Sequence, residues 1–154
     1  MPGAELFRQD LERLILDFIE DQQMCVLATC ADDIPRASAV EFFPRGFVLY
    51  ILTEGGRKIE NLSKNPFISV AIHTPFTGWD SIKGIQLSGM AEIGRTGSTI
   101  FREGEAAYRQ RKSAPDFSLP EFLFVIRIVP ATIEYLDTTL KTRGYAVRHT
   151  LEFP

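Results

Sequence analysis

The amino-acid sequence predicts a mainly β protein, a six-stranded antiparallel Greek-key barrel with peripheral helices. Three observations predict this fold class. Six segments have the apolar or alternating pattern of strands, short turn sequences separate most of them, and one long amphipathic helix precedes them all. The 154 residues suffice for one hydrophobic core. We expect a single domain over residues 1–154, with a helix at about 4–21, a barrel at about 24–136 and a polar tail at 138–154.

The first third of the chain is predicted to form a helix and then three strands. Apolar side chains recur at helical spacing between residues 4 and 21. These are Phe7, Leu11, Leu14, Ile15, Phe18 and Ile19. The pattern then becomes that of strands at 24–31, 35–43 and 47–53. The connections Asp-Asp-Ile-Pro and Pro-Arg-Gly contain turn residues, so the three strands are predicted to form a meander.

The rest of the chain is predicted to combine strands and helices. A short helix is expected to begin just after Gly55-Gly56 and to stop at Asn65-Pro66, and another is expected at 96–112. The remaining strands are expected at 67–73, at 82–93 and at 121–129, the last continuing through 132–137 after Pro130. The segment 138–154 shows no clear period.

Composition and charge exclude several classes of function. The net charge is −3 and the pI is near 5.4, whereas nucleic-acid-binding domains are usually basic. No apolar run reaches the roughly 18 residues of a membrane span, and the acidic N-terminus lacks the regions of a signal peptide. Cys25 and Cys30 lie on opposite faces of one predicted strand and cannot bridge each other. We expect both to be buried, reduced thiols of a cytoplasmic protein that binds neither nucleic acid nor membrane.

The sequence TEGGRK, which begins at Thr53, places two cations where a helix begins. Free N–H groups and the positive end of the helix dipole lie there, so Arg57 and Lys58 each cost roughly 0.3–1 kcal/mol unless an anion compensates them. Gly55-Gly56 lets the backbone approach a ligand closely. The combination indicates an anion site of the kind that holds phosphate, although the spacing is not that of a P-loop. The alternative is that neighbouring glutamates balance both cations in solvent.

Four other residues are candidates for ligand contacts. Arg36 and Ser38 share one face of the second strand, where they contact the polar edge of a planar ligand or lie on a solvated edge strand. Gln86 lies opposite the apolar stripe of the fifth strand and offers a donor and an acceptor, or it is an ordinary exposed residue. Trp79, the only tryptophan, either covers a ligand or caps the core.

No catalytic residue can be assigned from the sequence. The two histidines are isolated, no cluster has the spacing of a metal site, and no nucleophile–base pair is evident. Arg109, Arg111 and Lys112 end a predicted helix, where the dipole favours cations, so we interpret them as structural. If the protein is an enzyme, a cofactor carries its difficult chemistry.

The order of the segments resembles the FMN-binding split-barrel family related to pyridoxamine 5′-phosphate oxidase. The resemblance covers roughly residues 20–136. Its most specific part is LYILTEGGRKIENLSKNPFISVAI, and the strands PRASAVEFF and IQLSGMAEI also fit. It implies a split barrel and a homodimer with two FMN molecules at its interface. The twelve phenylalanines are consistent with an apolar association surface of this kind.

The resemblance also implies roles for the candidate residues. Thr53, Arg57 and Lys58 would hold the FMN phosphate. Five residues of the second strand would run along the isoalloxazine ring: Arg36, Ala37, Ser38, Ala39 and Val40. Gln86 would reach the ring, in many relatives from the partner subunit, and Trp79 would approach the ring or the ribityl chain.

An FMN-dependent oxidoreductase is the function that this resemblance favours. It would pass hydride or electrons from a reduced donor, with NADH and NADPH as candidates, to a small acceptor. The alternative is a flavin carrier or sensor without turnover, or a relative that binds haem or a deazaflavin instead. Vitamin B6 oxidation is not expected, because the tail with Arg143, Arg148 and His149 does not match the C-terminal segment of those oxidases.

Overall fold

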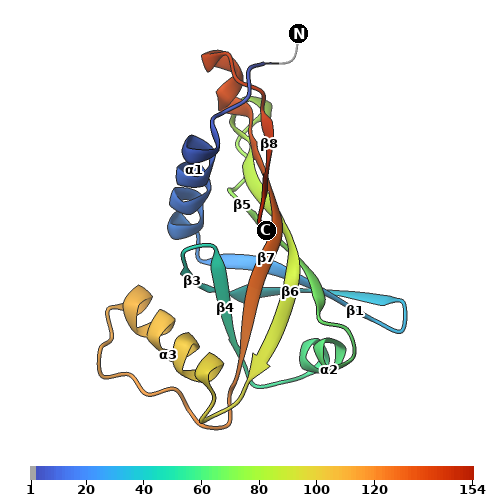
Figure 1. Cartoon of the computed structure of the whole chain (residues 1–154), viewed down its shortest axis with the longest axis vertical. Coiled ribbons are helices and arrows are strands. Elements are labelled where there is room, and N and C mark those ends of the chain that lie inside the picture. Colours follow the sequence, from blue (N-terminus) through green and yellow to red (C-terminus); the bar gives the residue numbers. More distant parts are fainter. Residues whose placement is uncertain (1–2) are drawn as a thin grey trace.

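The computed structural model describes residues 3–154, which contain one eight-stranded antiparallel sheet and peripheral helices (Figure 1). In chain order the elements are α1 (Arg8–Asp21), β1 (Met24–Ala31), β2 (Ile34–Glu41), β3 (Phe43–Arg45), β4 (Val48–Thr53), α2 (Arg57–Lys64), β5 (Phe67–His73), the 3-10 helix η1 (Trp79–Ser81), β6 (Lys83–Gly94), α3 (Thr99–Lys112), β7 (Phe124–Asp137), the 3-10 helix η2 (Thr138–Arg143) and β8 (Arg148–Glu152). The predicted class, an antiparallel barrel with peripheral helices, is confirmed, but six strands is too few.

The strands follow the order β2-β1-β5-β6-β7-β4-β3, with β8 beside the second half of β7. The chain leaves β4 through α2 and re-enters the sheet at β5. The later strands β6 and β7 then lie between β5 and β4. The hairpin of β6 and β7 runs along most of the molecule, with α2 near one end of it (Figure 1). This arrangement separates the α2 end of the sheet from the end where β8 lies.

The two additional strands arise where the sequence pattern is short or polar. The predicted strand 35–43 breaks at Phe42, which is fully buried and donates its N–H to Gln23, so residues 43–45 pair with β4 as a strand of their own. In β8 only His149 and Leu151 are buried, between exposed polar residues. Two buried positions are too few to reveal a strand period in the sequence, so no strand was predicted in the tail.

A bulge explains why β7 continues through its proline. The register of β6 and β7 shifts at Gly89, which pairs with Pro130. A bulge is a position where a residue without an N–H is tolerated. A Cβ at Gly89 would lie 2.1 Å from the Val129 carbonyl oxygen, so only glycine fits this close approach.

Both long helices begin later than their apolar periods suggest. Before α1, Ala4 exchanges backbone hydrogen bonds with Gly144 and Ala146, which draws the N-terminal segment away from the helix. Before α3, the Ser98 hydroxyl accepts the N–H of Phe101 at 3.1 Å and caps the helix. The boundaries are therefore 8–21 and 99–112 in place of 4–21 and 96–112.

The cations at the end of α3 have the structural role that we predicted. Arg111 donates to the carbonyls of Glu20 and Gln22 at the end of α1, Arg109 donates to a loop carbonyl, and Lys112 pairs with a carboxylate of β2. Arg111 thus fixes α3 against the C-terminal end of α1, where a cation also meets the negative end of the helix dipole.

The two cysteines differ from each other. Cys25 is buried, and burial raises the pKa of its thiol to about 12. Cys30 lies on the opposite face of β1 and is only half-buried, so the expectation of two buried thiols is wrong for Cys30. No helix within residues 3–154 is both long and apolar enough to cross a membrane.

Candidate functional site

A glycine corner connects β4 to α2. Gly55 and Gly56 have φ angles of 130° and 90°, which other residues adopt only with strain. The hydroxyl of Thr53, the last residue of β4, accepts the N–H of Gly55 at 3.3 Å. No side chain caps the N-terminus of α2, so its first N–H groups point outward without a side-chain acceptor.

The two cations of this corner have no counter-charge from the described chain. Within residues 3–154, no carboxylate oxygen lies within 4.0 Å of Arg57 or Lys58. Glu54 and Glu60 therefore form no ion pair with them. The alternative that neighbouring glutamates balance the two cations is wrong. Two positive charges add to the positive end of the helix dipole, so the corner favours a bound anion.

Arg36 lies on the strand pair next to this corner. The Asn61 side chain of α2 donates to the Thr29 hydroxyl of β1 at 3.0 Å, and Thr29 pairs across the sheet with Arg36. Directly paired residues project to the same face, so Arg36 lies on the face that α2 contacts. Ser38 and Val40 share this face, whereas Ala37 and Ala39 lie on the other.

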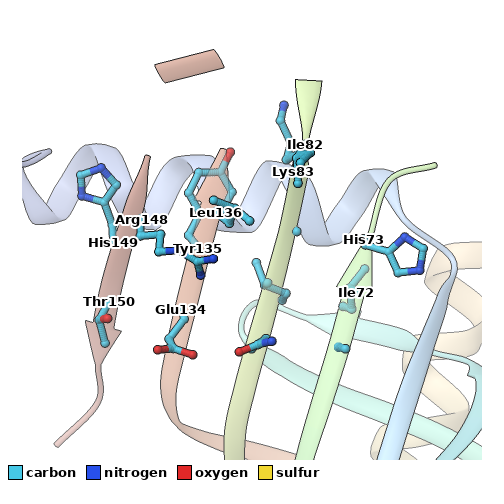
Figure 2. Close-up of a pocket in the computed structure, with 14 residues that line it drawn as sticks. Ile72, His73, Ile82, Lys83, Glu134, Tyr135, Leu136, Arg148, His149 and Thr150 are labelled. Atoms are coloured by element: carbon cyan, nitrogen blue, oxygen red, sulfur yellow. The ribbon is translucent and has the colours of Figure 1, made fainter. Parts of the chain in front are cut away.

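Gln86 lies on the outer face of the sheet, as its alternation with buried neighbours predicted. It borders a hollow of about 230 Å³ between adjacent strands β5, β6, β7 and β8 (Figure 2). The polar side chains of this hollow include Lys83, Gln86, Glu134, Arg148 and Thr150. At its inner wall Tyr135 is buried and donates to Asp137 at 3.1 Å. Burial, and then this carboxylate, raise the pKa of Tyr135, so its phenol stays protonated.

Gln86 and the glycine corner are far apart within this chain. Thr53 of β4 pairs with Phe124 of β7. The neighbouring Val125 pairs with Gly94, which ends β6 eight residues after Gln86. At about 3.3 Å per residue the separation is roughly 25–30 Å along the strand. This distance exceeds the length of one FMN molecule.

The loop between β5 and β6 contains Trp79. Its side chain is 79% exposed, so the interpretation that it caps the core is wrong. It lies beside a hollow of about 260 Å³ and contacts Phe76 edge to face, with ring centroids 5.6 Å apart. Trp79 is on the Gln86 side of the molecule, because β5 leads away from α2 and ends at this loop.

A model of the pyridoxamine 5′-phosphate oxidase family matches residues 11–136. The chain belongs to this family. The split barrel expected from the resemblance is thus confirmed by the family and by the sheet. A search of curated proteins found no match.

Solved structures of similar fold include proteins with different activities or ligands. A candidate pyridoxamine 5′-phosphate oxidase from Listeria innocua is 27% identical, with a TM-score of 0.65 over 82% of this chain and 98% of that one. An FAD-binding protein from Mesorhizobium loti is 19% identical, with a TM-score of 0.61 over 78% and 90%. HutZ, the haem storage protein of Vibrio cholerae, is 20% identical, with a TM-score of 0.64 over 78% and 89%.

In this member of the pyridoxamine 5′-phosphate oxidase family, the candidate residues form two groups. Thr53, Arg57 and Lys58 meet at the glycine corner with Arg36 nearby, whereas Trp79 and Gln86 lie toward the other end of the sheet. Sequence reasoning missed four residues of these sites: Asn61, Lys83, Glu134 and Arg148. Glu134 alternates with buried residues of β7, as Gln86 does on β6, and this pattern could have assigned it to the same face. The described residues contain no His, Cys, Asp or Glu cluster that could hold a metal.

Proposed function

We propose that the protein binds FMN and holds its phosphate at the N-terminus of α2. The observation that carries this proposal is the uncompensated pair of cations, Arg57 and Lys58, at an uncapped helix end. A phosphate dianion would offset both charges and accept the free N–H groups. Charge-assisted bonds of this kind contribute about 1.5–3 kcal/mol each. Family membership and the similarity to an FAD-binding protein favour a flavin as the bearer of the phosphate.

The glycine corner has room for such a ligand. A Cβ at Gly56 would meet no atom within 4 Å, so the backbone there is open to approach. The neighbouring strand β2 is at the edge of the sheet, and the backbone groups on its outer side have no strand partner. The five candidates Arg36, Ala37, Ser38, Ala39 and Val40 would present these groups to the polar edge of the flavin ring.

A second copy of the chain would complete the site. Gln86 cannot contact the FMN of its own protomer, because it lies roughly 25–30 Å from the glycine corner. We therefore assign its contact to the flavin held by the partner subunit. The outer face around Gln86 is suited to association: Phe67, Met90 and Val129 pair across three adjacent strands and are 65%, 46% and 41% exposed. Exposed apolar rows of this kind commonly mark interfaces.

Met90→Glu is expected to prevent dimerisation and release FMN, although Met90 is far from the phosphate corner. A charge in the centre of the apolar row would have to be desolvated on association, which is strongly unfavourable. The mass from analytical ultracentrifugation and the FMN content report the two effects. Phe122→Glu is the control, because Phe122 is 67% exposed, more than Met90, but lies in the loop before β7. A monomeric Met90→Glu variant that keeps its FMN would contradict a shared site.

An FMN-dependent oxidoreductase is the activity that we propose. When bound, FMN would supply the redox chemistry for a small acceptor, with NADH or NADPH as the reductant. The chain would hold the cofactor and orient it; no residue is assigned an acid or base role. A non-catalytic flavin-binding protein is the alternative. Buried His149 is unsuited to ligate haem, since both of its ring nitrogens are engaged, by Glu5 and by the Ala146 carbonyl.

Titration with FMN, riboflavin and haemin tests the proposal. We expect FMN to bind at least about a hundredfold more tightly than riboflavin, because riboflavin lacks the phosphate that the cations hold. Equal affinity for the two flavins would refute the phosphate site. Mixing the FMN complex with NADH or NADPH under anaerobic conditions then tests turnover. Bleaching of the flavin absorbance supports the oxidoreductase. A complex that stays yellow with NADH and with NADPH supports the non-catalytic binding protein.

A further inference from the structure

The loop of residues 74–82 exposes two aromatic side chains that the phosphate clamp does not use. Phe76 and Trp79 are 68% and 79% exposed, although burial of a side chain of this size contributes about 1.5–3 kcal/mol. The loop is nevertheless ordered by its own hydrogen bonds, including one of 2.6 Å between the hydroxyls of Thr77 and Ser81. The aromatic pair is therefore preorganised in water, as in a binding surface for a flat ring.

An apolar hollow lies beside this pair. It has a volume of about 260 Å³, and its apolar walls are Pro75, Phe76, Trp79 and Ile82. It shares His73, Ile82 and Lys83 with the hollow in which Gln86 lies. The two hollows therefore adjoin at these three residues, and together they are called the depression.

Lys83 supplies hydrogen-bond donors at the junction of the two hollows. Its Nζ lies 3.9 Å from the Asp137 carboxylate, too far for a hydrogen bond. The oxygens of Asp137 already accept from Tyr135 at 3.1 Å and from the N–H and hydroxyl of Thr139 at 3.0 and 2.6 Å. The Lys83 side chain is 40% exposed, and its ammonium group keeps its donors for a ligand.

Charges of both signs lie at the depression. The cations Lys83 and Arg148 line it together with the carboxylate of Glu134, and the buried carboxylate of Asp137 lies 3.9 Å from Lys83 Nζ. A full anion would be drawn to Lys83 but would also meet Glu134. A neutral ring with a carbonyl oxygen would accept from Lys83 and stack on the aromatic pair without that repulsion.

We propose that this depression binds a neutral, planar ring that bears carbonyl oxygens, as in a quinone. Trp79 and Phe76 contact the ring, and Lys83 donates to a carbonyl. The role of this ligand as the substrate of a flavoprotein rests on the proposed FMN site, whereas its binding does not.

Fluorescence titration with duroquinone tests the proposal. Trp79 is the only tryptophan, so its emission reports this site, and the fully substituted ring of duroquinone does not add to Cys30. We expect saturable quenching. The half-saturation concentration should rise about fivefold in Phe76→Ala and about tenfold in Lys83→Met. Phe122→Ala, which removes an equally exposed ring elsewhere, should have no effect.

Linear quenching, like that of free N-acetyltryptophanamide, would overturn the proposal, as would saturation that neither Phe76→Ala nor Lys83→Met changes. FMN content is measured in the same variants and should be unaltered. The titration is repeated on the Arg57→Ala/Lys58→Ala variant, where saturable quenching should persist. If that variant retains FMN while quenching stays saturable, the phosphate assignment fails and the quinone site stands.

Discussion

Replacing Arg57 and Lys58 together with alanine is expected to weaken FMN binding by about two to four orders of magnitude. Each cation contributes about 1.5–3 kcal/mol through a charge-assisted bond to the phosphate, and 1.4 kcal/mol corresponds to about a tenfold change in Kd. The fold should not suffer. Within residues 3–154 neither side chain forms an ion pair, and removing a cation from a helix N-terminus stabilises it by roughly 0.3–1 kcal/mol.

Two measurements on the double variant separate ligand binding from folding. Flavin titration should show the lost affinity for FMN with little change for riboflavin, while the Tm of the flavin-free protein should be unchanged or slightly raised. Lys64→Ala is the matched control, because Lys64 ends the same helix and pairs with Asp32 at 3.0 Å. It should leave FMN affinity intact. Full FMN affinity in the double variant would mean that the phosphate, if bound, lies elsewhere.

The glycine corner, where we propose that phosphate binds, could be predicted from sequence because all of its parts are consecutive. Gly55-Gly56 and Asn65-Pro66 mark both ends of α2, so the cations at 57 and 58 had to lie in its first turn. Local chain stiffness and the helix dipole determine such a motif without help from the rest of the fold. The same holds for the strands with turn residues at both ends.

The position of Gln86 relative to that corner could not be predicted in the same way. Its outward direction follows from the period of two, but its distance from Thr53 depends on the register of β6, β7 and β4, which are far apart in sequence. Lys83 was missed for a related reason. It directly follows the loop of Phe76 and Trp79, but the hollow that it shares with β5, β7 and β8 forms only in the folded sheet.

β3 and β8 show a second limit of sequence patterns. Three residues of β3 are too few for a period, and β8 presents exposed polar side chains on one face of a strand at the sheet edge. Their strand conformation is imposed by pairing with β4 and β7, whose backbone groups need partners. Tertiary context thus decides the structure of segments whose own preference is weak.

Glu103→Ala is expected to destabilise the protein by about 2–4 kcal/mol, because Glu103 fixes α3 to the sheet through two partners. It accepts the Tyr50 hydroxyl at 2.7 Å and Arg127 Nη1 at 2.9 Å. Tyr50 is 4% exposed, and Arg127 Nε already lacks a partner. Removing the carboxylate would leave a buried hydroxyl and a half-buried guanidinium incompletely paired. Urea unfolding measures the loss, with exposed Glu121→Ala as the control.

The pH dependence of stability identifies the charge as the cause. Hydrogen bonds from Tyr50 and then Arg127 lower the pKa of Glu103, so its contribution is present above the ordinary glutamate pKa and is lost as pH falls through the lowered value. Burial, and then Glu103, raise the pKa of Tyr50 from 10.0 to about 12, so that contribution is lost as pH rises across this range. In Glu103→Gln the carboxylate no longer titrates and no longer repels a tyrosinate. The free energy of unfolding of this variant should therefore fall less steeply at both pH extremes than that of the wild type. A difference between the two proteins that stays constant from acid to alkaline pH would show that Glu103 acts through packing and not through its charge.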